Sequence, residues 1–288
     1  MQQSGTECDF SSSDSWVILS PIEQSIKRKI EAVGTPLKDW DINIYRGVLT
    51  GYNEAFIIST EKREEILANC QTEDERKRTA ELIRPILRGR DIKRYGYTWA
   101  NLWLINTHNG IRGKLERIHI EDYPAVKAHL DQYWDKISKR ADKGETPYNL
   151  RNCAYLEDFS KPKMLWKRVG SILRFCYNDN ETLGLDSTCF ATGEKIEFIC
   201  CVLNSPMGHY LLKDAPKTGT GDLLVSVQAI EPIQLPQVGS ETNSEFKKLL
   251  ERLIKTDTPS NEKEISCKVF KLYDLSLDEQ SYIETNFT

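Results

Sequence analysis

The sequence lacks the features that mark membrane-spanning, secreted or zinc-stabilised proteins. None of its apolar runs approaches the roughly eighteen residues that a membrane-spanning helix needs. Residues 1–19 form a polar lead-in without the basic start and apolar core of a secretory signal. The eight cysteines form no Cys-x-x-Cys pair, and 288 residues exceed the usual size of disulfide-dependent secreted domains. We therefore expect a cytoplasmic protein without a membrane partner, whose cysteines are reduced and mostly buried.

Sequence motifs for cofactor binding and catalysis are also missing. There is no G-x-G-x-x-G after a predicted strand, no G-x-x-x-x-G-K-[ST], no H-E-x-x-H and no G-x-S-x-G. The nearest text, Thr218 to Gly221, precedes a predicted strand rather than a helix, which favours a flexible loop. The four histidines do not cluster in the sequence. We therefore assign no catalytic residue, no metal ligand and no cofactor to this chain.

A magnesium-dependent nuclease is the alternative function. Such an enzyme places one acid and an acid-x-Lys pair on neighbouring strands around the metal ion. Asp91-x-Lys93 has that spacing, and Glu194-Lys195 resembles it less closely. Asp91 follows a predicted helix end, however, where a solvated loop is the plainer interpretation. A protein-interaction module, which would expose an apolar patch, is a third possibility.

Charge is distributed unevenly along the chain. The net charge, counted as Lys and Arg minus Asp and Glu, is −5 for residues 1–83, +9 for residues 84–174 and −8 for residues 175–288. These values sum to the net charge of −4 for the chain. This basic middle third can be a chance cluster on solvated faces. It can also be a surface that binds a polyanion, for which the distribution of charge matters more than its sum.

Two basic segments, 84–95 and 161–174, lie in the middle third. They interleave Arg and Lys with aromatic residues, a composition that suits phosphate contacts and stacking. Arg88 and Arg90 can instead make structural ion pairs or stabilise a helix end. Loops 107–114, 141–152 and 214–221 are the expected contact loops. The predicted DNA-binding residues are Asn53, Arg88, Arg90, Lys93, Arg94, Lys161, Lys163, Lys167, Arg168 and Lys217.

The pattern of elements predicts an α+β fold with a mixed sheet and flanking helices, because it has no βαβ repeat. A turn at Thr50–Asn53 is expected to join the first two strands, with Gly51 at a positive φ or at a close backbone approach. Apolar periodicity and capping residues predict the helices. They are expected at 20–33, 60–70, 72–87, 122–140, 193–213 with an interruption at Asn204-Ser205-Pro206, 241–255 and 277–287. Strands are expected at 41–49, 54–59, 97–106 and 222–235, with several short ones between 150 and 190.

Several segments resemble the TaqI-like C-terminal specificity domain. This family follows the catalytic domain in adenine-N6 DNA methyltransferases and in single-chain type IIG restriction–modification enzymes. The resemblance covers residues 16–255 and rests on combined motifs, each of which is weak alone. The first are Gly34-Thr-Pro-Leu-Lys-Asp-Trp40, Ile44-Tyr-Arg-Gly47, Thr50 to Ile58, and Ile83-Arg-Pro-Ile-Leu-Arg-Gly-Arg-Asp-Ile92. The later ones are Pro147 to Tyr155, Phe159 to Lys163, Leu203 to Ser205, and Leu235-Pro236.

The resemblance implies that residues 20–258 form a target-recognition domain for double-stranded DNA, followed by a C-terminal extension at 259–288. It implies an upstream methyltransferase domain as partner, which binds S-adenosylmethionine through a glycine-bearing loop and carries an Asn-Pro-Pro-Tyr or Asn-Pro-Pro-Phe motif. Neither feature occurs in this sequence. An enzyme that extrudes its target adenine needs a second body to hold the duplex. We therefore expect this chain to recognise DNA sequence and to be non-catalytic in isolation.

Overall fold

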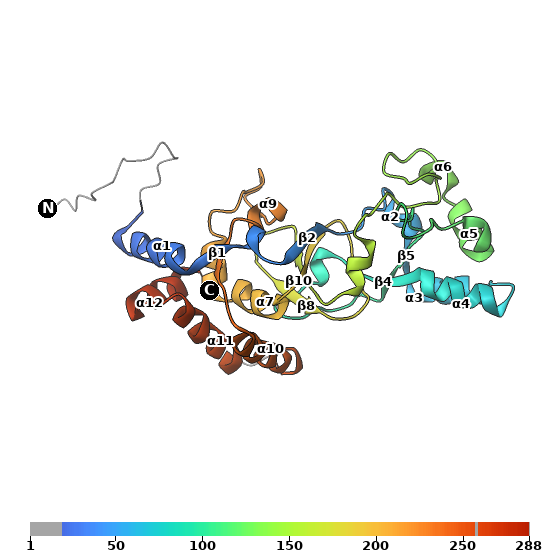
Figure 1. The fold of residues 1–288 in the computed structure, drawn as a ribbon. Helices are drawn as coiled ribbons and strands as arrows, with labels where there is room; N and C mark the ends of the chain where they lie inside the picture. The colour runs from blue at the N-terminus through green and yellow to red at the C-terminus, as the bar shows by residue number, and fades with distance from the viewer. Residues whose placement is uncertain (1–18, 257–258, 288) are drawn as a thin grey trace.

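The computed structural model describes residues 19–256 and 259–287, and it has the expected α+β fold (Figure 1). The helices are α1 Pro21–Val33, α2 Asn53–Phe56, α3 Thr60–Ala68, α4 Glu73–Leu82, α5 Pro124–Asp131, α6 Trp134–Ile137, α7 Ile196–Asn204, α8 Pro206–Leu211, α9 Val227–Ile230, α10 Ser240–Lys255, α11 Pro259–Leu272 and α12 Leu277–Asn286. The strands are β1 Gly34–Pro36, β2 Ile42–Arg46, β3 Ile57–Ser59, β4 Ile83–Leu87, β5 Leu102–Ile105, β6 Lys163–Lys167, β7 Val169–Gly170, β8 Phe175–Asn178, β9 Leu183–Gly184, β10 Thr188–Gly193, β11 Leu223–Leu224 and β12 Gln234–Pro236.

An antiparallel sheet of order β2-β10-β6-β8 occupies the middle of the molecule (Figure 1). Successive side chains of a strand point to opposite faces, so each strand of this sheet contributes to two cores. Met164 and Trp166 of β6 belong to one buried cluster, whereas Leu165 between them belongs to the other. The sheet therefore joins the two ends of an elongated molecule.

The helical end lies on one side of this sheet. Helices α1, α7, α8, α10, α11 and α12 gather there (Figure 1), and the apolar face of α7 is buried almost completely. Ile265, Val269 and Phe270 of α11 and Ile283 of α12 are at most 1% exposed in the same cluster. The division of the chain at residue 258 stays a prediction, although α11 and α12 add buried residues to a core that precedes them in the sequence.

The opposite end, which we call the lobe, comprises residues 47–160. Its strands β3, β5 and β4 form a second sheet of order β3-β5-β4-β9, in which β9, from outside the lobe, pairs in parallel with β4. Helices α2 to α6 surround this sheet (Figure 1). Glu75 is only 3% exposed and accepts hydrogen bonds from the backbone of Gln71 and Ala125, so it fixes α4 against the start of α5.

Several predicted elements are confirmed, among them the first helix. Ser20 caps α1 and forms a capping box with Glu23, and Gly34 ends the helix. The predicted helix at 193–213 is broken at Ser205-Pro206 into α7 and α8, as its sequence indicated. Within the described residues, no helix is both long and apolar enough to cross a membrane.

Other predicted elements are wrong in extent or pairing. The strands at 41–49 and 54–59 form no hairpin, because β2 pairs with β10 and β3 pairs with β5 in the other sheet. Residues 53–56 are a helical turn instead of strand. The helix predicted at 72–87 ends at Leu82, since Ile83–Leu87 form strand β4 with Pro85 inside it. Helix α11 and the helical turn α9 were not predicted.

Candidate nucleic-acid interface

A shallow groove lies at the junction of the two large sheets. It has a volume of about 520 Å³, and the lobe and the central sheet both contribute to its walls. Four predicted DNA-binding residues meet here, although they are far apart in the sequence. They are Asn53, Arg88, Arg90 and Lys167, and the lining also includes Glu54, Ile57, Gly89, Leu102, Leu185, Asp186 and Ser187. We call this surface the junction groove.

Arg88 reaches the groove in a fixed orientation. Its Nε and Nη2 donate to the two carboxylate oxygens of Asp91 at 3.1 and 2.8 Å, and Asp91 also accepts from the Arg88 backbone at 2.8 Å. Asp91 is only 5% exposed. The expected solvated loop at Asp91 is therefore wrong, because this carboxylate stabilises a tight 3₁₀ turn at Gly89–Asp91. A bidentate pair of this kind holds a guanidinium better than a single contact does.

Gly89 allows the two basic segments to approach each other. A Cβ at Gly89 would lie 2.8 Å from Cγ of Lys167 and 3.0 Å from the carbonyl oxygen of Ser187. The Gly89 amide donates to Oγ of Ser187 at 3.1 Å. Arg90 is exposed beside this contact. The Arg-Gly-Arg sequence thus places two cations next to the end of β6.

Lys167 ends β6 with its ammonium exposed. Its stem extends over Gly170, where an added Cβ would lie 3.2 Å from Nζ. Arg168, the next residue, is half-buried and bonds through its backbone to Ser187 and Val225. Lys217 is exposed opposite Leu223, which pairs with Gly170. The structure therefore brings the 214–221 loop close to this end of the central sheet.

Lys163 does not belong to this surface, and its assignment as a DNA contact is wrong. It lies at the other end of β6 and is 0% exposed. Its ammonium donates to Oδ1 of Asn178 at 3.0 Å and to the carbonyl oxygen of Asn180. Burial lowers the pKa of Lys163 to about 8. A strand rises about 3.3 Å per residue, so the four steps to Lys167 separate the two α-carbons by roughly 13 Å.

Two further cations are also held by acids away from the groove. Arg94 forms a 3.1 Å ion pair with Glu262 of α11 and donates to the Asn204 carbonyl oxygen at 2.8 Å. Lys161 pairs with Asp158 near the buried end of β6. Lys93 is exposed in the turn that leads to Gly96. The predicted DNA-binding cations of the two basic segments therefore divide, and Arg88, Arg90 and Lys167 remain together.

The corner at Thr50–Asn53 forms one rim of the groove. Gly51 has the expected positive φ of 71°, and a Cβ there would lie 2.7 Å from the Asp142 carbonyl oxygen. Arg140, only 6% exposed, holds this corner through its guanidinium. It donates to the carbonyl oxygens of Thr50, Asn149, Asp142 at 2.7 Å and Pro147 at 3.1 Å. The close approach and this bonding give Gly51 a role in the fold.

Acidic side chains moderate the charge of the groove. Asp186 lines it and lies 3.8 Å from Arg46 at the end of β2, while the Glu54 carboxylate accepts from the Tyr52 hydroxyl. Sequence reasoning missed Arg46, Asp186 and Ser187, which reach this edge only through the pairing of β2 with β10. No group of three or more His, Cys, Asp or Glu suited to a metal ion occurs among residues 19–256 and 259–287.

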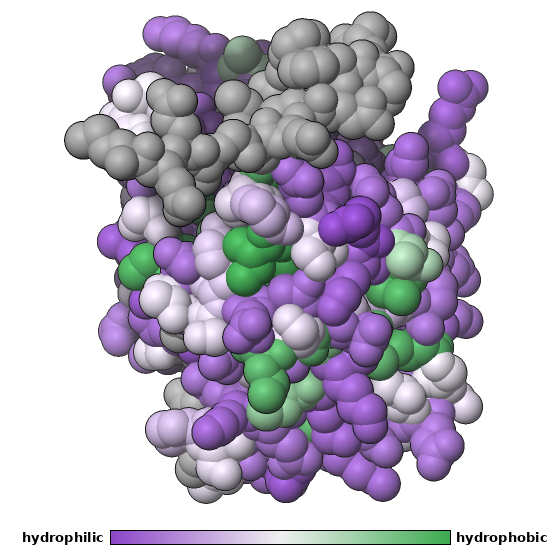
Figure 2. Space-filling model, turned by 90° about the vertical axis from the view of Figure 1, so that its left-hand side faces the viewer, coloured by the Kyte–Doolittle hydropathy of each residue, from purple (hydrophilic) through white to green (hydrophobic). Residues whose placement is uncertain are grey.

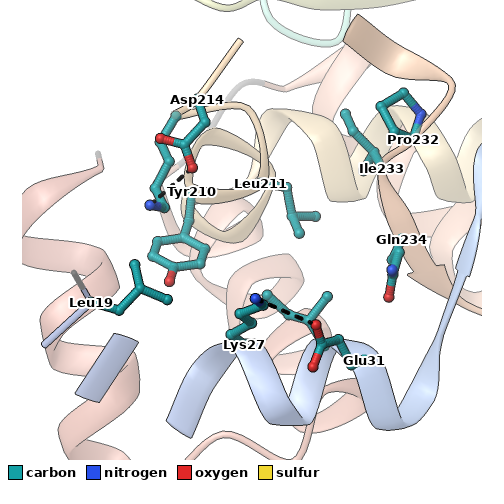
Figure 3. A pocket seen from close by; sticks show the side chains of 11 residues that line it. Leu19, Lys27, Glu31, Tyr210, Leu211, Asp214, Pro232, Ile233 and Gln234 are labelled. Carbon is teal, nitrogen blue, oxygen red and sulfur yellow. Dashed lines mark ion pairs between the residues drawn. The ribbon is translucent and has the colours of Figure 1, made fainter. Parts of the chain in front are cut away.

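A separate cavity of about 400 Å³ lies at the helical end, between α1, α8 and the segment before β12 (Figure 3). Its lysines face acids: Lys27 lies 3.8 Å from Glu31, and Lys213 lies 3.1 Å from Asp214. Figure 2 shows this end of the molecule, where small apolar patches are scattered over a mainly polar surface. Both lysines that line this cavity are thus paired with acids, in contrast to Arg90 and Lys167 of the junction groove.

Two solved structures resemble this chain. The type IIL restriction–modification enzyme MmeI, solved in complex with DNA, matches with a TM-score of 0.61 and 10% sequence identity, over 88% of this chain and 36% of MmeI. This chain has a fold found in restriction–modification enzymes. The type IIG restriction endonuclease BpuSI matches with a TM-score of 0.54 and 14% identity, over 92% of this chain and 31% of BpuSI. The chain thus spans about a third of each enzyme. No family model and no curated protein matches the sequence.

Proposed function

We propose that this chain is a target-recognition module for double-stranded DNA in a restriction–modification enzyme. The observation that carries the proposal is the junction groove. Three cations from two distant basic segments meet there, beside Asn53, in a fold that MmeI also has. Arg88 is fixed by Asp91, whereas Arg90 and Lys167 are exposed and free to reach phosphate oxygens. Phosphate contacts of this kind fix the position of a protein on a duplex.

The proposal includes a division of labour within a longer enzyme. The resemblance to TaqI-like specificity domains and the partial coverage of MmeI and BpuSI support a separate catalytic domain. We propose that this domain is an adenine-N6 methyltransferase, that it binds S-adenosylmethionine, and that it works on DNA held by the present chain. Methylation at a specific site then depends on side chains of this chain that contact base edges in a groove.

Duplex binding measured by fluorescence anisotropy across a series of salt concentrations tests the DNA-binding role. Arg90→Gln and Lys167→Met remove a positive charge while they keep most of the side-chain length. Each variant is expected to weaken binding to all duplexes and to reduce the log–log salt slope by about 0.9 per lost phosphate contact. Lys248→Gln removes an exposed cation from α10 at the other end of the molecule and serves as the matched control.

Either of two results refutes the proposal. If the wild-type chain fails to bind duplex DNA at low salt, the DNA-recognition role is wrong. If Lys248→Gln weakens binding as much as Arg90→Gln and Lys167→Met do, binding is nonspecific over the surface and the groove has no special part in it.

A further inference from the structure

A short finger projects from the lobe at residues 108–118. Ile111 and Leu115 pair across a three-residue loop of Arg112, Gly113 and Lys114. The Ile111 amide donates to the Leu115 carbonyl oxygen at 2.8 Å, and the Leu115 amide donates back at 2.9 Å. Gly113 has a φ of 76°, and a Cβ added there would meet no atom within 4 Å. The loop is therefore tight, and open space surrounds Gly113 at its tip.

The base of the finger is fixed by buried polar groups. Asn149, only 1% exposed, donates to the Ile118 carbonyl oxygen at 2.8 Å, and the Ile118 amide donates to His108 at 3.0 Å. Thr107 is fully buried and donates through Oγ1 to the Tyr148 carbonyl oxygen at 2.7 Å. These bonds connect the 107–114 and 141–152 loops into one rigid unit, so the tip is held at a fixed position.

The two cations at the tip have no acidic partner. Within the described part of the chain, neither Arg112 nor Lys114 makes an ion pair or a side-chain hydrogen bond, and both are exposed. Arg117, nearer the base, instead pairs with Glu145 at 3.4 Å. A hollow of about 830 Å³ lies against the finger, and its walls include Arg112 and Lys114 themselves beside Asn109, Asn152, Glu116 and Glu145. The finger therefore presents two cations without acidic partners to solvent, where a polyanion can reach them.

A chain of contacts connects the finger to the corner that borders the junction groove. Gly51 of this corner lies against Asp142, and Asp142 forms a 3.1 Å ion pair with Arg151. The next residue, Asn152, accepts a hydrogen bond from Asn109 at the base of the finger. The groove rim and the base of the finger therefore belong to one connected part of the lobe.

We propose that the finger enters the major groove of DNA and that Arg112 reads a guanine, with Lys114 on a neighbouring phosphate. The assignment rests on the proposed DNA-binding function and names the residue that selects sequence. The major groove is about 12 Å wide and admits a two-stranded β-ribbon. The arginine fork matches O6 and N7 of guanine, whereas a lysine is a point charge that suits phosphate. The junction groove then positions the duplex, and the finger contributes specificity.

Selection of bound sequences from a randomised duplex library, with the full chain, tests this assignment. Arg112→Ala is expected to remove the preference for guanine at one position and to weaken binding to the selected sequence roughly ten-fold. Arg112→Lys keeps the charge but loses the planar fork, so it is expected to weaken the same preference with an unchanged salt slope. Lys114→Ala is expected to weaken binding to all sequences equally and to reduce the log–log salt slope by about 0.9. Circular dichroism confirms that each variant is folded.

Two outcomes overturn the finger assignment while the proposed function stands. In the first, the wild-type chain binds DNA through the junction groove, but Arg112→Ala leaves both affinity and selected sequence unchanged. In the second, Arg112→Ala weakens all sequences equally, so Arg112 contacts the backbone and reads no base. A wild-type chain that binds every duplex alike overturns both the finger assignment and the sequence recognition in the proposed function. Absence of any duplex binding by the wild-type chain instead refutes the proposed function itself.

Discussion

Replacement of Arg140 by methionine is expected to destabilise the lobe. The side chain lies beneath the Thr50–Asn53 corner with its guanidinium 4.5 Å from the Phe56 ring centroid. It donates to four carbonyl oxygens and makes no ion pair within the described residues. Burial lowers its pKa to about 10, so the guanidinium is still charged at neutral pH. Methionine fills a similar volume but has no donor to offer.

The expected magnitude follows from which acceptors lose their only partner. Thr50 is 1% exposed, and its carbonyl oxygen has no second donor in the described structure. The Asn149 carbonyl oxygen keeps the bond from the Gly144 amide at 2.9 Å, and Asp142 and Pro147 are half-exposed and can bind water. A buried acceptor without a partner costs about 1–3 kcal/mol. Loss of the cation–π contact adds to this cost, whereas removal of a buried charge partly offsets it. The free energy of unfolding should therefore fall by about 2–4 kcal/mol.

Urea denaturation followed by fluorescence measures this loss, with Arg151→Met as the control. Arg151 is 61% exposed and makes one ion pair, to Asp142, so its replacement should change the free energy of unfolding by less than about 1 kcal/mol. Arg140→Lys should lie between the two, because an ammonium can satisfy some of the carbonyl oxygens. If Arg140→Met and Arg151→Met have equal stability, the carbonyl cluster does not hold the corner and the reasoning is refuted.

Four other changes test separate features. Gly51→Val should cost about 1–3 kcal/mol, because a φ of 71° and the Asp142 carbonyl oxygen both oppose a side chain; unchanged thermal stability with weaker DNA binding would assign Gly51 to contact instead. Asp91→Asn should lower stability by about 1.5–3 kcal/mol through loss of the bidentate Arg88 pair, and an unchanged urea midpoint would contradict this. Lys163→Met should leave DNA affinity unchanged. Burial lowers the pKa of Lys163 to about 8 from 10.5, so between pH 8 and pH 10.5 the unfolded chain binds more protons than the folded chain. The free energy of unfolding of the wild type should therefore rise with pH across this range, relative to that of Lys163→Met. Incubation of the chain with labelled S-adenosylmethionine and DNA should yield no methylated product, and turnover would place a catalytic site within it.

Local sequence was sufficient for elements whose ends are specified by neighbouring residues. Ser20 and Glu23, three residues apart, fix the start of α1. The adjacent residues Ser205 and Pro206 fix the break between α7 and α8. Strand pairing depends on residues far away. Nothing near Thr50 in the sequence indicates that β2 pairs with β10 while β3 pairs with β5. The sequence of β4 continues the pattern of the preceding helix, and only its pairing with β5 makes it a strand.

The candidate site could be predicted only in part for the same reason. Lys163 and Lys167 have the same parity in β6 and similar neighbours in sequence, so both were expected to be exposed. Residues 178–180 cover the first of them, whereas the second lies at the open end of the strand. The charge partition indicated which third of the chain is basic, but which of its cations remain unpaired depends on distant acids such as Glu262.

The attachment of the lobe has a consequence for the energetics of association. The chain leaves the central sheet through β2 and returns through β6, and both strands are hydrogen-bonded along their length to β10 between them. Two parallel tethers on one strand oppose hinge bending, so the groove keeps its shape in the free chain. The proposed docking of a duplex would then cost little conformational entropy, and it should resemble the binding of a preorganised inhibitor to its protease more than the folding of a loop around its ligand.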